Sequence, residues 1–522
     1  MWDGVTPIRI LLGRDGLYGL KNTDRVPLGG LLQLRNATLE DTTLRTAGGA
    51  AKLGTAIPGA PKISAAVDYF PTTGQQRTVV MASDGTLQKD DGAGGGWATL
   101  LSGLTASGAV PFFTPGGGEV LNNDRLLFYA DGLNQERVMV ADGASFAALT
   151  SPPADWAGTN RPSAFVIHEG YNWAFGNKNA PHLLYRSLHT NHRDFTTTRF
   201  AVPIFSGEGE YLVGGLSYKG GLLLWKFPEG AYWYDTRNAD TNEWRAFKVG
   251  AGGMPGPGCC VLIEDDAIWV DPYGGVHMIS ATTATGSVRA QDLAYRKLGR
   301  FIPDQISREE LPRANLIYYS DKQQLWLACA ATGATTKNRR LILDLNNKGE
   351  VGERWSFEDR DTNEALFLRK KAGVLRPAMG DDVGQLWELD QVTRSKDGAG
   401  YTFEWWLADT DFAQRVPGWA GKLKNLHYLQ ALHVPLSTVS HSIEVWRDGN
   451  LRQTLAVALS GGSVSFPLTL PFTFGAEMMQ VTRPRRLRGQ ARRLAFRGLS
   501  TVAATDISLS GLIVGVTLAG GT

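Results

Sequence analysis

The sequence predicts an all-β protein, in which a β-propeller of six or seven four-stranded blades is followed by a C-terminal β-sandwich. Three observations lead to this prediction. The stretch 213–249 contains four short apolar runs, each closed by turn residues. Similar units recur roughly 40 to 55 residues apart, which is the length of one propeller blade. From about residue 397 onward the units stop, and strand-like runs alternate with turns in the pattern of a sandwich.

The stretch 213–249 reads VGGLSYKGGLLLWKFPEGAYWYDTRNADTNEWRAFKV. Gly220-Gly221 and Pro228-Glu229-Gly230 separate its first three runs, and the polar loop 237–242 precedes the fourth. Short aromatic and aliphatic runs between such turns are typical of consecutive antiparallel strands. One four-stranded sheet is not stable alone, so this unit needs neighbours of the same kind.

Units of this kind recur along the chain, and each joins two strand-like runs across an acidic or glycine turn. Together with 213–249 they occupy 77–89, 124–140, 163–186, 259–279, 315–344 and 365–389. A tryptophan follows the turn at a similar place in five of the units, and we expect these side chains to pack between blades. They are Trp173, Trp225, Trp269, Trp326 and Trp387.

The units divide the chain into three parts. We expect residues 1–60 to form an extended N-terminal arm with strands at 7–12 and 31–36, which closes the ring or reaches a neighbouring molecule. Residues 61–396 form the propeller, and residues 397–522 the sandwich. The sandwich strands are predicted at 401–406, 424–433, 441–447, 463–470, 492–496 and 507–516.

The segment 291–311 interrupts the series of blades. Leu293, Leu298, Ile302 and Ile306 recur at helical spacing, and Pro303 breaks the pattern. We therefore expect one or two short helices that project from a blade.

Composition excludes several classes of protein. The 53 basic residues exceed the 51 acidic ones by two, so the net charge of +2 provides no field that would draw the chain to nucleic acid or membrane. Cys259, Cys260 and Cys329 form neither a disulfide framework nor a CxxC zinc site. The N-terminus lacks a secretory signal, and no run reaches about 18 apolar residues. We expect synthesis in a cytosol and no membrane insertion by this chain.

Motifs for catalysis are absent from the sequence: it contains no GxSxG, HExxH or Walker pattern. His189, His192 and Asp194 could bind a metal, but a solvated loop is the favoured interpretation. Asp265-Asp266 and Asp381-Asp382 could act as acid and base, but solvated turn carboxylates are favoured. The sequence therefore predicts no enzyme, no catalytic residue, no cofactor and no metal.

Two further patterns are read as loops or turns. The glycine runs 92–96 and 116–118 do not open helices, so loops are favoured over phosphate cradles. Ser83-Asp84-Gly85-Thr86 resembles part of the Asp-box of propeller sialidases, but the spacer and the tryptophan of that motif are missing. A plain hairpin turn is the favoured interpretation.

One local feature is strongly charged. The segment 483–497, RPRRLRGQARRLAFR, carries seven arginines and no acidic residue, so the rest of the chain has a net charge of 2 − 7 = −5. The arginines either contact an acidic partner or phosphates, or they pair with acidic residues inside the sandwich. Arginine without lysine favours fixed bidentate contacts. The candidate interface residues are Arg483, Arg485, Arg486, Arg488, Arg492, Arg493 and Arg497.

The order of these parts resembles a family. The N-terminal segment PLGGLLQLRNATLED…LRTAGGAAKLG is followed by propeller units with VGGLSYKGGLLLWKFPEGAYWY, and the chain closes with ARRLAFRGLSTVAATDISLSGLIVGV. In this order and texture the chain is similar to the tail nozzle or hub proteins of short-tailed bacteriophages, over most of its length.

The resemblance implies a structural protein of the virion tail, made in the cytoplasm of a bacterial host. Such proteins form a homo-oligomeric ring, typically of six copies, below the portal and adaptor and next to distal tail proteins. Double-stranded DNA passes through the ring, which often carries a gate; no gate residues can be identified by match here. The alternative is a carbohydrate-binding or glycan-degrading β-propeller, but a glycan-degrading enzyme needs carboxylates at the central mouth, and no repeated acidic loop pattern is present.

Overall fold

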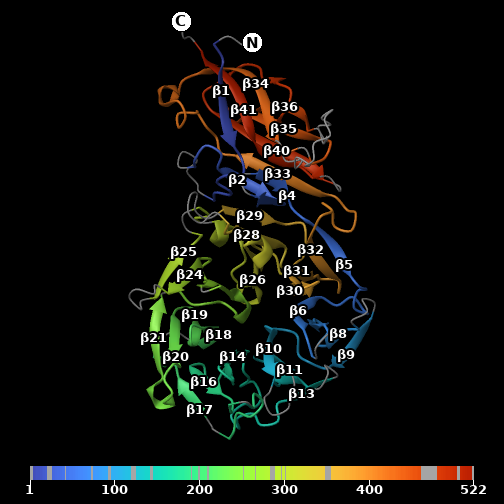
Figure 1. Cartoon of the computed structure of the whole chain (residues 1–522), viewed down its shortest axis with the longest axis vertical. Helices are drawn as coiled ribbons and strands as arrows, with labels where there is room; N and C mark the ends of the chain where they lie inside the picture. Colours follow the sequence, from blue (N-terminus) through green and yellow to red (C-terminus); the bar gives the residue numbers. More distant parts are fainter. Residues whose placement is uncertain are drawn as a thin grey trace, which may run out of the picture.

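The structure of this chain is a computed structural model. It describes residues 4–19, 26–40, 43–71, 75–91, 96–118, 125–140, 145–189, 191–197, 200–207, 211–250, 252–264, 266–281, 288–294, 297–299, 301–346, 354–434, 436–459, 479–502 and 506–519. In Figure 1 a ring of small sheets lies below a separate group of strands that contains both chain ends. The predicted all-β fold, with a propeller and a C-terminal β-sandwich, is confirmed.

Seven units of four antiparallel strands make up the ring. Six are separate four-stranded sheets, and the remaining one, β26–β29, continues into a longer sheet. The first strands of successive units contact one another in the order β6, β10, β14, β18, β22, β26 and β30, and β30 contacts β6 again. The ring is therefore closed and has seven blades, the larger of the two predicted numbers.

The strand bounds follow the predicted units closely. Blades 1 and 2 comprise β6 (Ile63–Tyr69), β7 (Arg77–Ala82), β8 (Leu87–Asp90), β9 (Trp97–Leu101), β10 (Phe112–Gly118), β11 (Arg125–Ala130), β12 (Arg137–Val140) and β13 (Ser145–Ala148). Blades 3 and 4 comprise β14 (Ala164–His168), β15 (Tyr171–Phe175), β16 (Leu183–Arg186), β17 (Phe200–Pro203), β18 (Tyr211–Tyr218), β19 (Gly221–Phe227), β20 (Ala231–Asp235) and β21 (Arg245–Gly250). Blades 5 to 7 comprise β22 (Cys260–Ile263), β23 (Asp266–Val270), β24 (Val276–Ala281), β25 (Val288–Asp292), β26 (Asn315–Tyr319), β27 (Gln324–Cys329), β28 (Arg339–Asp344), β29 (Arg354–Glu358), β30 (Ala365–Lys371), β31 (Val374–Gly380), β32 (Leu386–Gln391) and β5 (Gly49–Leu53).

Blade 7 takes its outer strand from the other end of the chain. β5 pairs antiparallel with β32, and Lys52 lies opposite Trp387. On the next seam, the buried carboxylate of Glu364, just before β30, lies 3.0 Å from Nζ of Lys62, just before β6. Blade 7 is thus bonded both to the N-terminal segment and to blade 1, which ties the ring closed.

Aspartates form the turns between the second and third strands of four blades. Their carboxylates accept a hydrogen bond from the backbone N–H two residues later, which stabilises a tight turn without help from the sheet. The four residues are Asp84, Asp131, Asp271 and Asp381. The hairpin-turn interpretation of 83–86 is therefore confirmed, and the same device recurs around the ring.

The five tryptophans are buried between blades, as predicted. Each is at most 6% exposed, and the rings of Trp225 and Trp269, from blades 4 and 5, lie 5.5 Å apart. Four lie on the second strand of their blade, whereas Trp387 lies on the third. The sequence alignment of the last unit is shifted because it leaves out the second strand, β31.

The predicted glycine loop 116–118 is wrong, since these residues end β10.

Two sheets form the sandwich. The first is eight-stranded and comprises β1 (Thr6–Leu11), β3 (Ala37–Glu40), β4 (Thr43–Thr46), β34 (Lys424–His433), β37 (Gln480–Val481), β38 (Arg485–Arg486), β39 (Gln490–Ala491) and β41 (Ser508–Leu518). The second contains β2 (Leu31–Arg35), β33 (Tyr401–Leu407), β35 (Val439–Arg447), β36 (Asn450–Leu459) and β40 (Leu494–Val502). The predicted strand 463–470 lies outside the described residues, and β36 was not predicted.

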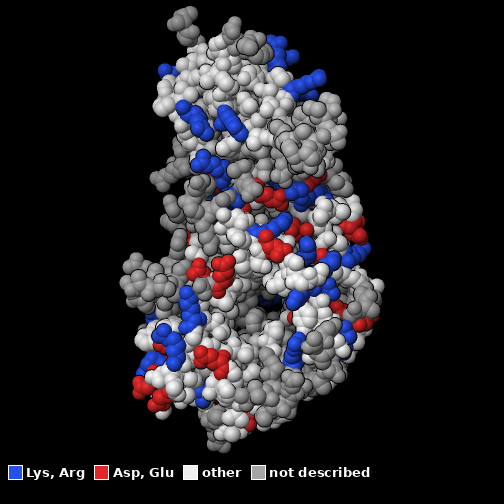
Figure 2. All heavy atoms as spheres, in the orientation of Figure 1, with Lys and Arg blue, Asp and Glu red and all other residues white. Residues whose placement is uncertain are grey.

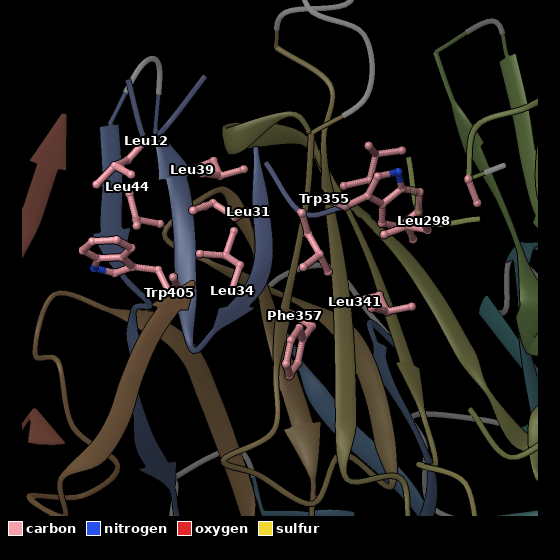
Figure 3. Close-up of a cluster of buried hydrophobic side chains, with 14 of the residues drawn as sticks. Leu12, Leu31, Leu34, Leu39, Leu44, Leu298, Leu341, Trp355, Phe357 and Trp405 are labelled. Atoms are coloured by element: carbon pink, nitrogen blue, oxygen red, sulfur yellow. The ribbon is translucent and has the colours of Figure 1, made fainter. Parts of the chain in front are cut away.

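One continuous sheet joins the propeller to the sandwich. Its nine strands run in the order β26-β27-β28-β29-β2-β33-β40-β35-β36, so blade 6 extends directly into the second sandwich sheet. β2 pairs with β29 on one side and β33 on the other. Figure 3 shows Leu31 and Leu34 of β2 between Trp405 of the sandwich and Trp355 and Phe357 of blade 6. This shared core holds the two parts together.

The N-terminal residues are built into both parts of the molecule. β1 pairs with β41, β4 pairs with β3 and β41, β2 bridges the two parts and β5 completes blade 7. Within the part of the chain that the structure describes, the strands predicted at 7–12 and 31–36 therefore lie in sheets.

In its described residues, the segment between β25 and β26 contains the short helix α1 (Phe301–Gln305) and the 3₁₀ turn η4 (Leu311–Arg313). Leu293, Leu298, Ile302 and Ile306 are each at most 4% exposed and belong to the large core that includes Trp355. The segment therefore packs inward and does not project from a blade. Its regularly spaced apolar residues are buried against the junction between the propeller and the sandwich.

The remaining helical turns are short. They are the 3₁₀ turns η2 (Thr241–Glu243), η3 (Pro257–Cys259), η5 (Ser320–Lys322) and η6 (Pro417–Trp419). Among the described residues, no helix has the length and apolar character needed to span a membrane.

Candidate functional site

Among the described strands, the arginine-rich segment forms an edge of the eight-stranded sandwich sheet. Its short strands β37, β38 and β39 all pair with β34, at the border of the eight-stranded sheet. Arg485 lies opposite Leu429, and Arg486 lies opposite Tyr428. We call residues 479–493 the arginine-rich edge. An edge strand presents backbone and side chains to the surroundings, so this segment is placed for contact with another molecule.

Five of the seven arginines point into solvent. Arg483, Arg485, Arg486, Arg488 and Arg492 are exposed. None of these five side chains forms an ion pair with an acidic residue in the part of the chain that the structure describes. Guanidinium groups without a carboxylate partner among the described residues can make bidentate contacts to another molecule.

The other two arginines pair inside the sandwich. Nε of Arg493 donates a hydrogen bond of 2.7 Å to Asp409, and Nε of Arg497 donates one of 2.7 Å to Glu404. The Glu404 and Glu444 carboxylates outweigh burial and raise the pKa of Arg497. Pairing inside the sandwich is thus shown for Arg493 and Arg497, whereas a contact with another molecule stays a prediction for the five exposed arginines.

The backbone of the arginine-rich edge is held firmly although its side chains are exposed. The Asp448 carboxylate accepts the backbone N–H groups of Arg492 and Arg493, at 3.1 and 2.8 Å. Arg447 donates to the carbonyl of Arg488 at 2.7 Å, and Leu487 is only 2% exposed. A fixed backbone lowers the entropy that ordering the segment on a partner would cost.

Apolar side chains accompany the arginines. Leu451, Met479 and Val481 are 45%, 45% and 51% exposed, and Gln453 of the same strand as Leu451 donates to the carbonyl of Arg486. On the face shown in Figure 2, basic side chains lie over the sandwich at the top, and acidic ones begin near the junction with the propeller. Arginine next to exposed apolar groups is typical of the energetically important part of a protein interface.

The described metal and acid–base candidates contact other residues of the propeller. The ring of His189 packs on Tyr171 with centroids 4.8 Å apart, whereas His192 is buried. Burial raises the pKa of Asp194, but hydrogen bonds from Thr197 and Thr196 outweigh this and lower it. No group of three potential metal ligands converges within the described ranges.

The described carboxylates of the two acidic pairs have structural positions. Asp381 accepts the indole N–H of Trp387 at 2.8 Å, and Asp382 accepts the hydroxyl of Thr362 at 2.7 Å. Asp266 lies on β23, and Asp265 and the glycine run 92–95 lie outside the described residues. These carboxylates serve turns or strand ends.

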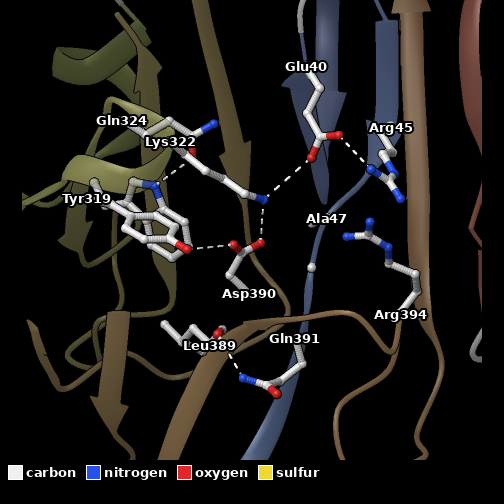
Figure 4. A network of polar contacts seen from close by, with 12 residues as sticks. Glu40, Arg45, Ala47, Tyr319, Lys322, Gln324, Leu389, Asp390, Gln391 and Arg394 are labelled. Carbon is white, nitrogen blue, oxygen red and sulfur yellow. Dashed lines mark hydrogen bonds and ion pairs between the residues drawn. The ribbon is translucent and has the colours of Figure 1, made fainter. Parts of the chain in front are cut away.

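A second polar site lies where the propeller meets the sandwich, and the sequence analysis missed it. Figure 4 shows Nζ of Lys322 between two carboxylates: it lies 2.8 Å from Asp390 and 3.4 Å from Glu40. Glu40 also pairs with Arg45 at 2.6 Å, and Asp390 accepts the Tyr319 hydroxyl at 3.2 Å. Burial raises the pKa of Glu40, but Lys322 and Arg45 outweigh it and lower that pKa.

No sequence signal marks this junction site. Lys322 and Glu40 are 282 positions apart in the chain, and neither lies in a motif. The aspartate turns, by contrast, left a signal that could have been found, because each follows the second strand of its unit.

Comparison with known proteins leaves the family of this chain open. No family model matches the chain, and no curated protein matches it. Among solved structures, the chain is similar to one in a structure titled "Crystal Structure of Mitotic Checkpoint Complex", with a TM-score of 0.39, 8% identity and coverage of 66% of this chain and 94% of that chain. It is also similar to the computationally designed Ika8 protein, with a TM-score of 0.36, 10% identity and coverage of 65% and 99%.

Proposed function

We propose that this chain is a structural protein of a bacteriophage tail, a nozzle or hub subunit that forms a ring with copies of itself. In this proposal the ring lies below the portal and adaptor, contacts distal tail proteins, and conducts and gates double-stranded DNA. The observation that carries the proposal is the arginine-rich edge. Five exposed guanidinium groups on a fixed backbone, without acidic partners among the described residues, are arranged to bind another molecule.

The chemistry of the edge favours a protein partner over DNA. Leu451, Met479 and Val481 expose apolar surface beside the arginines, and such surface gains free energy against a protein but not against a phosphate backbone. A conduit must also let DNA slide, whereas a dense ring of arginines would retain phosphates. Contact with DNA is therefore transient in this proposal, and the edge faces a neighbouring subunit or tail protein.

The continuous nine-stranded sheet suits a subunit that carries mechanical load. β2 bonds to blade 6 and to the sandwich at once, so the sandwich cannot swing on a flexible linker. The arginine-rich edge belongs to the eight-stranded sheet, and the side chains of Arg447 and Gln453 link its backbone to β35 and β36 of the nine-stranded sheet. This supports an architectural role better than a loosely tethered binding module.

The proposal is tested by the assembly state of the full chain. Mass photometry and negative-stain imaging should find closed rings, with six copies as the expected number. A triple variant, R485S/R486S/R488S, should lose rings or binding to an adjacent tail protein. The matched control is R125S/R245S/R415S, which removes three exposed arginines elsewhere and should assemble normally.

The possible results distinguish a protein interface, a contact with DNA and a glycan-binding propeller. Loss of assembly in the first variant alone supports a protein interface at the edge. Normal rings with weaker retention of double-stranded DNA would place the edge on the channel. A wild-type chain that stays monomeric and binds or cleaves a glycan would overturn the proposal in favour of the carbohydrate-binding or glycan-degrading propeller.

A further inference from the structure

A hollow of about 570 Å³ opens at the junction between the propeller and the sandwich. Three parts of the chain surround it: the β3–β4 hairpin, blade 6 around η5, and blade 7 with the residues after β32. Its polar lining includes Glu40, Arg45, Lys322, Arg376, Asp390 and Arg394. The volume is in the range of small-molecule sites.

The inner carboxylates of this hollow already have cationic partners. Glu40 pairs with Arg45 and Lys322, and Asp390 pairs with Lys322 and accepts the Tyr319 hydroxyl. Asp321, in the turn η5, is exposed at the rim. The inner wall therefore has little acceptor capacity left for a cationic ligand.

Donor capacity remains on two arginines. Arg376, on β31, makes no ion pair or side-chain hydrogen bond with any other residue that the structure describes. Arg394 is 5% exposed and donates to Asp506 at 3.1 Å, while its Nε has no hydrogen-bond partner within the described ranges. A guanidinium with unused donors can bind an acceptor that enters the hollow.

We propose that the junction hollow binds the oxyanion group of a small polar ligand, either a carboxylate or a phosphate, with Arg376 as the principal contact. The planar guanidinium presents two parallel N–H groups that match both kinds of oxyanion. Arg394 supplies further positive charge. The lining also contains the amides of Gln324 and Asn346, and the Asn346 amide already donates one N–H to the Lys322 carbonyl at 2.9 Å. The site is independent of the arginine-rich edge and of the proposed ring.

Ligand binding here should stabilise the fold, because the three surrounding parts come from distant segments of the chain. A ligand that binds only the folded state raises its stability in proportion to the logarithm of its concentration. The expected signature is a rise in Tm with phosphate or glucuronate at constant ionic strength. Glucose, which is neutral, should leave Tm unchanged.

The test uses isothermal titration calorimetry on the full chain with inorganic phosphate, sodium glucuronate and glucose as probes. R376Q should weaken oxyanion binding by about tenfold or more, because a charge-assisted contact is lost. R376K keeps the positive charge but loses the two parallel N–H groups of the guanidinium, so its affinity for the oxyanions should lie between those of the wild type and R376Q. R125Q is the matched control, since Arg125 is exposed on β11 of blade 2 and does not line this hollow.

The titrations show which kind of oxyanion binds in the hollow and whether the proposed site exists. Binding of phosphate alone identifies a phosphoryl ligand, and binding of glucuronate alone identifies a carboxylate; both support the site. No binding of either probe by the wild type at millimolar concentration overturns the inference. Equal affinity in the wild type and R376K overturns it as well, and this comparison remains available should R376Q fail to fold.

Discussion

The indole N–H of Trp405 donates a hydrogen bond of 3.0 Å to Nε2 of His441, across the strand that separates them. Trp405 lies on β33 and His441 on β35, and β40 runs between these strands. Nδ1 of His441 lies 2.7 Å from the Ser500 hydroxyl. Because Nε2 accepts from the indole, the neutral ring carries its proton on Nδ1 and donates it to Ser500. Both ring nitrogens are thus used by the neutral form.

The stability of the fold should fall as pH falls, because of His441. Burial lowers the pKa of this residue to about 3, below the ordinary value of about 6.5 that it regains on unfolding. The unfolded chain then binds more protons between these values, so the stabilisation is complete above pH 6.5 and declines towards pH 3. At pH 5 the expected loss is about 2 kcal/mol.

Urea unfolding of the wild type and H441Q at pH 5 and pH 7 measures this effect. H441Q should be less stable at pH 7 but should show a smaller change between the two pH values. H189Q, at an exposed histidine, should keep the pH dependence of the wild type. An identical pH dependence in H441Q and the wild type would contradict the prediction.

Gly498 should not tolerate a side chain. It lies on β40 directly under the Trp405–His441 hydrogen bond, and a Cβ there would meet Nε1 of Trp405 at 2.1 Å and Nε2 of His441 at 2.4 Å. G498A should destabilise the chain by about 1–3 kcal/mol through overpacking and should alter tryptophan fluorescence. G418A is the control, because a Cβ at Gly418 would meet no atom within 4 Å. Equal unfolding midpoints for both variants would refute the assignment.

Trp225 should be important for the seam between blades 4 and 5. Its side chain is 0% exposed and packs on Trp269. W225A should cost roughly 3–5 kcal/mol, the usual cost of removing a large aromatic side chain from a core. Trp233 of the same blade is only half-buried, so W233A should cost clearly less in the same thermal or urea unfolding experiment. A loss below about 1 kcal/mol for W225A would show that it does not hold the seam.

The blades could be predicted from the sequence because their determinants are local. In 213–249, the turns at Gly220-Gly221 and Pro228-Glu229-Gly230 set where strands end, and the apolar residues between them set which strands are buried. The burial of Trp225 followed from the recurrence of the unit alone. The predicted strand 424–433 coincides with β34 for the same reason.

Other features depended on partners far away in the chain, so only the tertiary structure decided them. The apolar spacing of Leu298 and Ile302 is the same for a projecting helix and for a segment that packs inward. The segment packs inward because these side chains join the junction core around Trp355. The sequence of β5 resembles that of any short strand, and only its pairing with β32 shows that it completes blade 7. The seven arginines were equivalent in sequence, and only the positions of Asp409 and Glu404 separated the paired ones from the exposed ones.

By itself the sequence determined the repeat, the turns and the apolar strands of this protein, because hydrogen bonding and burial over a few residues settle them. The tertiary structure decided the number of blades, the seam that closes the ring, the continuous sheet through β2 and the junction hollow. These depend on contacts such as that of Glu40 with Lys322, which are 282 positions apart. Charge and hydrogen-bond complementarity at that separation appears only when the chain has folded, because no local pattern records which distant residue will lie opposite.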